Sequence, residues 1–153
     1  CFEGAGDLLG FPDVWFGGYR QRSDIHAFPI LSARFHQEII PLELVDNRFY
    51  HLDTCLCPLS GGELLYFPAA FDAYGQAAIA DRIPDRLRFA VPEDEALRFA
   101  CNAVCIGKHV VLPVGSPATQ AWLHDQGYET HAVHLDEFMK SGGAAKCLTL
   151  ALD

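Results

Sequence analysis

Short apolar stretches alternate with polar, Gly- or Pro-marked segments along the whole chain. Three of them have the length and apolar content of buried strands, namely VWFGGY (14–19), LLYFPAA (64–70) and HVVLPVG (109–115). After a helix-like stretch, each is followed by a second strand-like run, namely IIPLEL (39–44), LRFAV (87–91) or THAVHL (130–135). The pattern therefore predicts a strand–helix–strand order that occurs three times.

Polar residues and glycine mark the expected helix ends. Ser23 and Asp24 are suited to cap the first helix, and Ser116 followed by Pro117 is suited to begin the third. Gly127 is placed to end that third helix. These signals predict helices between the paired strands.

The segments before these strands recur with a spacing of about 50 residues, beginning at Cys1, His51 and Cys101. A ββαβ unit of this size cannot bury both sheet faces alone, so neighbouring units must stack or circle an axis. We expect a single α/β domain of pseudo-symmetric ββαβ repeats over residues 1–153. Its expected parts are repeats at about 1–47, 48–98 and 99–144, and a closing strand at 145–153.

If the repeats surround an axis, the polar residues at their openings share one pocket. These residues are Glu3 to Asp7, His51 to Asp53, Cys101-Asn102, and Cys147 in the terminal stretch GGAAKCLTLAL. A thiol with an imidazole is a nucleophile–base pair, and carboxylates beside them bind a cationic group. Such a pocket suits attack on a planar, positively charged carbon. The other interpretation of Cys147 is a buried core thiol.

Composition narrows the choice of partners. The 153 residues are 50% hydrophobic and carry a net charge of −9, which argues against a nucleic-acid partner and is compatible with a small cationic substrate. The apolar runs are too short to span a membrane.

The cysteines and histidines give no metal-binding pattern. The six cysteines form no C-x-x-C unit and the seven histidines no H-E-x-x-H, so we predict no metal and reduced thiols in a cytoplasmic protein. Four cysteines are interpreted as strand packing, namely Cys55, Cys57, Cys101 and Cys105. Asn102 is interpreted as a residue that satisfies backbone groups, and the histidines other than His51 receive no role.

Several motifs resemble the guanidino-group-modifying superfamily, which includes arginine deiminases, dimethylarginine dimethylaminohydrolases and amidinotransferases. They are H-L-D-T at 51–54, E-G-A-G-D at 3–7, G-Y-R-Q-R-S at 18–23, and the near-terminal Cys147 after Gly142-Gly143. The resemblance covers the whole chain in order. It implies a five-bladed α/β propeller with the active site on its axis, and a covalent thiouronium intermediate on the cysteine.

The resemblance also implies roles for individual residues. Cys147 would attack the guanidinium carbon, and His51 would protonate the departing amine and then activate water. Asp53 would bind guanidino nitrogens, and so would Glu3 or Asp7. The family usually has Glu-Gly-Gly-Asp, and the extra residue here leaves open which of the two acids binds substrate.

Arg22 would bind a substrate carboxylate by the same resemblance. The length of the chain differs from that of the family. Five units of about 50 residues exceed the 153 residues present, which supply about three blades. The chain therefore resembles the C-terminal portion of such an enzyme, and either missing N-terminal blades or a homo-oligomer would complete the ring.

The leading functional hypothesis is a hydrolase that cleaves the C–N bond of a guanidino compound of the arginine or methylarginine type, without a cofactor. Amidino transfer to an amine is the alternative within the same family. A second alternative is an N-terminal nucleophile amidohydrolase that uses Cys1. The third is a non-catalytic truncated propeller that serves as a subunit or binding module.

Overall fold

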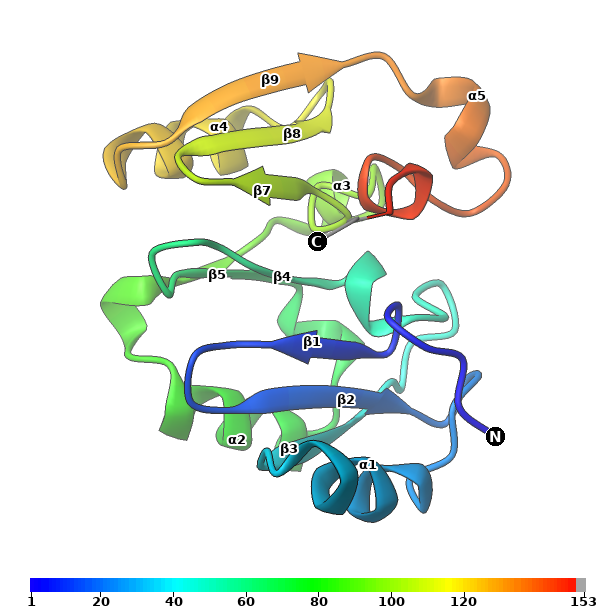
Figure 1. Ribbon diagram of the computed structural model, residues 1–153. Helices are drawn as coiled ribbons and strands as arrows, with labels where there is room; N and C mark the ends of the chain where they lie inside the picture. The colour runs from blue at the N-terminus through cyan, green and yellow to red at the C-terminus, as the bar shows by residue number, and fades with distance from the viewer. Residues whose placement is uncertain (151–153) are drawn as a thin grey trace.

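The computed structural model describes residues 1–150, and the apolar stretches at 14–19, 64–70 and 109–115 each contain the middle strand of a small sheet (Figure 1). The strands are β1 (Leu8–Gly10), β2 (Trp15–Tyr19), β3 (Ile39–Glu43), β4 (Leu56–Pro58), β5 (Leu64–Tyr66), β6 (Arg88–Ala90), β7 (Val104–Ile106), β8 (His109–Pro113) and β9 (Glu129–Val133). The helices are α1 (Ala27–Phe35), α2 (Ala73–Arg82), α3 (Glu93–Ala96), α4 (Pro117–Asp125) and α5 (Asp136–Met139).

The three sheets have the same strand order. In each, the first strand pairs antiparallel with the second, and the second pairs parallel with the third. Parallel neighbours need a crossover connection, and α1, α2 and α4 lie within these connections in the first, second and third sheets. The predicted α/β class is confirmed, as three small mixed sheets with helices; a ring of five blades stays a prediction.

One apolar core runs through all three sheets. Phe16 and Leu42 contribute to it from the first sheet, Leu65 from the second, and Val110 and Leu112 from the third, and all five are fully buried. Because these residues alternate with more exposed ones in β3 and β8, one face of those strands is buried and the other is less covered. The three sheets are therefore packed into one body.

The first helix begins later than the sequence predicted. Its first residue is Ala27, His26 occupies the N-cap position, and neither Ser23 nor Asp24 caps it. The Asp24 carboxylate instead accepts the N–H of His26 at 2.9 Å, and the Ser23 hydroxyl donates to Asp7 at 2.7 Å. The side chains expected to cap the helix are used in a turn and in the candidate site.

The third predicted helix, α4, begins and ends where the sequence indicated. Ser116 is its N-cap residue, and Gly127 follows its end in the left-handed conformation, with φ of 79°. The Ser116 hydroxyl does not cap the helix. The buried carboxylate of Glu95 accepts the N–H groups of Ala118 and Thr119, at 2.7 and 2.9 Å. A side chain from α3 thus replaces the local cap.

The closing strand expected at 145–153 is wrong within the described residues. Lys146–Leu148 form a 3₁₀ turn, and Thr149 and Leu150 are in no strand. The side-chain oxygen of Asn102 accepts the N–H groups of both Ala144 and Cys147, which holds the backbone in a turn. Residues 151–153 lie outside the described part of the chain.

The first strands of the three sheets line a common cavity. It measures about 550 Å³ and is bordered by residues of β1, β4 and β7, with Asp53 and Lys146 also on its wall. In Figure 1, β1 and β7 are the strands of their sheets that lie nearest to the middle sheet. The first residues of the predicted repeats, which we expected to lie together, contribute Ala5, Asp53 and Cys101 to the wall of this cavity.

The helices are short. The longest in the described residues, α2, has ten residues, and no helix in that part of the chain is long and apolar enough to cross a membrane.

Candidate active site

Cys147 lies in the 3₁₀ turn at the end of the described chain. The residue is exposed, and its Sγ lies 3.2 Å from the side-chain nitrogen of Asn102 and 4.0 Å from Oδ1 of Asp53. Partial burial, which is the largest cause, and the neighbouring Asp53 charge raise the thiol pKa, whereas the hydrogen bond from Asn102 opposes them. In the absence of a bound cation, the thiolate is therefore disfavoured.

Asn102 joins three segments of the candidate site. Its side chain is fully buried, and its oxygen accepts the N–H groups of Ala144 and Cys147, at 2.8 and 3.2 Å. Its amide nitrogen donates to the carbonyl of Asp53 at 3.0 Å and to the Cys147 thiol. Its expected role toward backbone groups is observed, and the contact with the thiol is what sequence reasoning missed.

Asp53 presents a carboxyl group beside the Cys147 thiol. It lies in the 3₁₀ turn Leu52–Thr54, and only 6% of its surface is exposed. Burial raises its pKa to about 6, although His51 and Lys146 act in the opposite direction. A cationic ligand at this position would stabilise the ionised form.

His51 immediately precedes that turn. Its Nε2 lies 2.9 Å from Oε2 of Glu3, and the same oxygen accepts a hydrogen bond from Nε of Arg22 at 2.9 Å. The hydrogen bond with His51 is the main cause that lowers the pKa of Glu3. The Arg22 guanidinium also lies over the Tyr50 ring, 5.7 Å from its centroid. Glu3 therefore orients the imidazole, and Arg22 is paired with Glu3.

The segment before Asp53 and the segment that carries Cys147 lie side by side. The Tyr50 hydroxyl donates to the carbonyl of Gly142 at 2.9 Å, and the Cys147 thiol approaches Asp53 at the other end of the same segments. His51 therefore enters the site between these two contacts. The structure places the Cys147 thiol beside Asp53, and His51 precedes Asp53 by two residues with its imidazole on Glu3; a joint role for the three residues stays a prediction.

Asp7 is buried and bonded within the fold. Only 1% of its surface is exposed, and its two oxygens accept the Ser23 hydroxyl at 2.7 Å and the N–H of Leu52 at 3.0 Å. Burial is the main cause that raises its pKa. These bonds fix the turn that carries Asp53, and both oxygens are already used. Substrate binding by Asp7 stays a prediction, while Glu3 and Asp53 are the acids next to His51 and Cys147.

Of the remaining thiols, all except Cys1 are less exposed than Cys147. Cys55, Cys57 and Cys101 are buried, and burial raises the pKa of each, that of Cys57 to about 12. Cys1 is exposed, like Cys147, and its carbonyl accepts the N–H of Asp24. All six cysteines are free. Cys1 therefore provides an internal reference for the reactivity of Cys147.

Replacement of Gly143 by alanine should displace the Cys147 side chain. A Cβ at Gly143 would lie 2.7 Å from Cβ and 2.9 Å from Sγ of Cys147, closer than side-chain atoms pack. We expect a loss of about 1–3 kcal/mol in unfolding free energy and slower alkylation of Cys147 relative to Cys1. Gly107→Ala, in an open turn, is the control and should leave the alkylation ratio unchanged. An unchanged ratio in Gly143→Ala as well would contradict this packing.

A thiol beside one carboxyl group and an imidazole beside another thus lie at loop ends of an α/β fold. No family model matches the chain. The chain is 46% identical over 152 residues to the bifunctional arginine dihydrolase/ornithine cyclodeaminase ArgZ of Synechocystis sp., covering 97% of this chain and 21% of ArgZ. It is 39% identical over 150 residues to the N(G),N(G)-dimethylarginine dimethylaminohydrolase of Mycobacterium tuberculosis, covering 98% and 49%.

A solved structure of one of these relatives has the same fold as this chain. The N-terminal domain of ArgZ, as a cysteine-to-serine mutant bound to substrate, superposes with a TM-score of 0.95 at 45% identity, over 97% of this chain and 56% of that domain. The homologues of this chain therefore include guanidino-modifying enzymes. The chain spans about half or less of the length of these relatives. Correspondence to a C-terminal portion is not confirmed, because the structure it matches is named as an N-terminal domain.

Proposed function

We propose that this chain forms the cysteine-bearing part of a hydrolase that cleaves a C–N bond of a guanidino compound of the arginine or methylarginine type. The observation that carries the proposal is the position of the Cys147 thiol, beside the Asp53 carboxyl group and under a hydrogen bond from Asn102. Homology to an arginine dihydrolase and a dimethylarginine dimethylaminohydrolase supports the substrate class.

Substrate binding activates the thiol in this proposal. A guanidinium group that donates N–H groups to Asp53 ionises this carboxyl and places a positive carbon near Sγ of Cys147. The same positive charge favours the thiolate, whose pKa is raised without it. Glu3 holds His51 through the 2.9 Å contact, and Arg22 is the residue we propose for a substrate carboxylate.

The first half-reaction forms a covalent intermediate. The Cys147 thiol gives its proton to the His51 imidazole, and Sγ bonds to the guanidinium carbon. The C–N bond to the leaving group then breaks, and the imidazolium protonates the departing amine. The product is a thiouronium on Cys147 and a free amine. A solved structure of the ArgZ N-terminal domain covalently bonded to a reaction intermediate supports such a step.

The second half-reaction uses water. His51 accepts a proton from a water molecule as its oxygen bonds to the thiouronium carbon. The C–S bond then breaks, the remaining proton of the water leaves to solvent as the urea-type product forms, and the imidazolium returns its proton to the thiolate. Each step is assigned to a side chain of this site, so the proposed mechanism includes no cofactor.

Hydrolysis is favoured over amidino transfer, because the relatives are named for an arginine dihydrolase and a dimethylarginine dimethylaminohydrolase activity, and neither name describes a transferase. The fate of the amidino group separates the two: a urea-type product indicates hydrolysis, and a new guanidino compound indicates transfer. A non-catalytic binding module retains the pocket and lacks an activated thiol. The alternative of an N-terminal nucleophile requires that the substrate binds at Cys1 and not at Cys147.

The remainder of the enzyme belongs to the proposal too. The cavity lined by β1, β4 and β7 supports an arrangement of ββαβ blades around an axis. Further blades, from a longer chain or from other copies, would close a five-bladed ring and complete the substrate pocket. Six free thiols agree with the reducing cytoplasm that we propose as the location.

Alkylation by a cationic reagent tests this proposal. We expect a haloacetamidine to modify Cys147 at least about tenfold faster, relative to exposed Cys1, than a neutral haloacetamide does, because an amidinium can pair with Asp53 and a hydrogen bond to a charged group contributes about 1.5–3 kcal/mol. Mass spectrometry locates the modified residue. His51→Ala should reduce modification of Cys147 and leave Cys1 unaffected.

Two results would contradict the proposal. Equal preference for the cationic reagent at Cys1 and Cys147 would show that the site does not recognise an amidinium, which favours the non-catalytic alternative. Preferential modification of Cys1 would favour the N-terminal nucleophile instead. Circular dichroism of His51→Ala confirms that a lost reactivity does not come from unfolding.

A further inference from the structure

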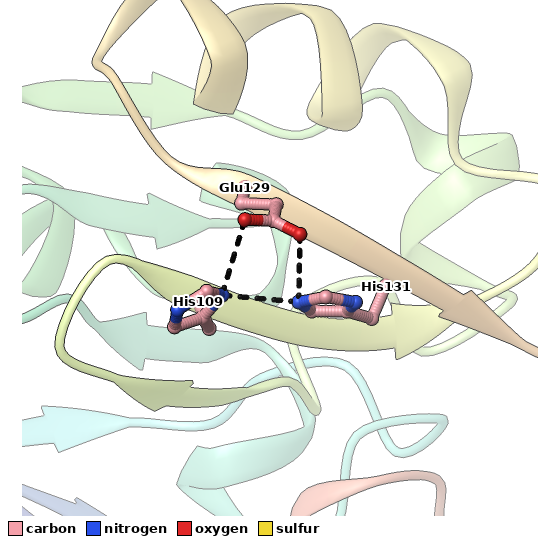
Figure 2. Close-up of side chains that lie close together, drawn as sticks. All are labelled: His109, Glu129 and His131. Atoms are coloured by element: carbon pink, nitrogen blue, oxygen red, sulfur yellow. Dashed lines mark hydrogen bonds and ion pairs between the residues drawn. The ribbon is translucent and has the colours of Figure 1, made fainter.

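Two histidines and a glutamate lie together on the third sheet, apart from the residues assigned to the candidate active site. Figure 2 shows His109 on β8 with Glu129 and His131 on β9, and the three side chains face one another. One donor atom from each lies within 4.8 Å of the donor atoms of the other two. All three residues are exposed, so the cluster is open to ions in solution.

The strand register produces this cluster. His109 is directly opposite Glu129 in the parallel pair β8–β9, and His131 follows two positions along β9, on the same face. Thr130, between them, points to the other face, where its hydroxyl contacts His124 of α4 at 2.9 Å. Two rigid, hydrogen-bonded strands therefore fix the relative positions of the three side chains.

The distances fit the ligand set of a metal ion better than a hydrogen-bonded triad. Nδ1 of His109 lies 3.1 Å from Nε2 of His131, and the two Glu129 oxygens lie 3.5 and 3.7 Å from these nitrogens. The carboxylate is too far from both rings for good hydrogen bonds. Tetrahedral zinc, with bonds of about 2.0–2.2 Å to nitrogen and oxygen, places its ligand atoms about 3.3–3.5 Å apart.

We propose that His109, Glu129 and His131 form a binding site for a divalent transition-metal ion of the zinc class. Two imidazoles and one carboxylate suit zinc, cobalt, nickel and copper, whereas magnesium and calcium prefer oxygen ligands. The three protein ligands leave a coordination position for water or a small anion. The site is separate from the proposed reaction at Cys147 and does not depend on it.

The sequence gives little sign of this site, because His109 and His131 are 22 residues apart and meet only through the parallel register. His109 is on β8, and Glu129 and His131 are on β9, the strand that follows the helical connection. The H-E-x-x-H pattern, by contrast, brings its ligands together within one helix.

Zinc binding by the full chain tests the proposal. The titrations use isothermal calorimetry in a Cys1→Ser/Cys147→Ser background, because the two exposed thiols also bind zinc. We expect one ion per chain and a loss of affinity of at least about tenfold in His109→Ala and in His131→Ala, since even outer partners of metal ligands contribute about 10–100-fold. His134→Ala, an exposed histidine beside β9, is the matched control and should bind as the parent does.

Cobalt identifies the ligand type independently. A cobalt spectrum without thiolate-to-metal charge transfer, lost in His131→Ala, is expected from nitrogen and oxygen ligands. Absence of zinc binding, or equal affinity in both histidine variants and their parent, would overturn the proposal and leave a hydrogen-bonded imidazole pair. Because all three side chains are exposed, the alanine variants should fold, which circular dichroism verifies.

Discussion

Asn102→Ala should lower the free energy of unfolding by about 3 kcal/mol and release the turn that carries Cys147. The substitution removes the acceptor of two backbone N–H groups and the donor to the Asp53 carbonyl, in a fully buried place. Each buried polar group left without a partner costs about 1–3 kcal/mol. Urea unfolding measures the loss, and the alkylation ratio of Cys147 to Cys1 reports the position of the thiol.

The chain contains a matched control, because its other asparagine, Asn47, is exposed. Asn47→Ala should change stability by no more than about 0.5 kcal/mol. Asn102→Asp retains the acceptor for the two backbone N–H groups but places a carboxylate oxygen against the Cys147 thiol. It should therefore slow alkylation of that thiol relative to the parent protein. If Asn102→Ala unfolds like the parent protein, Asn102 does not hold the site together.

The strands could be predicted because their burial depends on local composition. The apolar side chains of β2, β5 and β8 contribute to the core, as their composition alone predicts. Gly127 ends α4 because glycine readily adopts the left-handed conformation. The start of α4 shows the limit of such reasoning. Its cap is Glu95, from another element, and no residue near Ser116 indicates this.

The terminal segment shows the same limit more strongly. Its alternating Leu-Thr-Leu pattern predicts a strand, yet Lys146–Leu148 form a turn. The decisive contacts come from Asn102, which is 45 residues away from Cys147. Local propensity is a weak preference, and the two hydrogen bonds to the buried Asn102 side chain outweigh it.

The candidate site could be predicted in its members and less well in their roles. The equal spacing of His51 and Cys101 indicated which segments converge, and Asp53 and Cys147 are indeed adjacent. Sequence gave Glu3 and Asp7 similar roles, but their surroundings differ. Asp7 is bonded by Ser23 and a backbone N–H, whereas Glu3 reaches the imidazole. Only the three-dimensional partners distinguish an acid that supports the backbone from one that contacts the His51 imidazole.

Asp53→Asn should stabilise the protein above pH 6 while it removes the preference of Cys147 for a cationic reagent. Burial raises the pKa of Asp53 from an ordinary 3.8 to about 6, so the folded state binds this proton more tightly than the unfolded state does. The contribution of Asp53 to stability is therefore fully present below about pH 4 and is lost as the pH rises through about 6. A shift of two pKa units corresponds to about 3 kcal/mol, which is the expected upper gain in Asp53→Asn at pH 8.

Urea unfolding at pH 4 and pH 8 measures this effect as the difference between variant and parent. Asp46→Asn is the opposite control, because the hydrogen bond from Arg48 is the main cause that lowers the pKa of Asp46. That variant should be less stable than the parent at both pH 8 and pH 4, because the contribution of Asp46 is lost only as the pH falls below about 4. If Asp53→Asn is more stable at pH 8 and loses the preference of Cys147 for the cationic reagent, the Asp53 carboxylate binds a ligand at a cost to the stability of the fold. If Asp53→Asn loses stability at pH 8 and keeps the reagent preference, Asp53 is a structural residue and the guanidinium proposal loses its binding group.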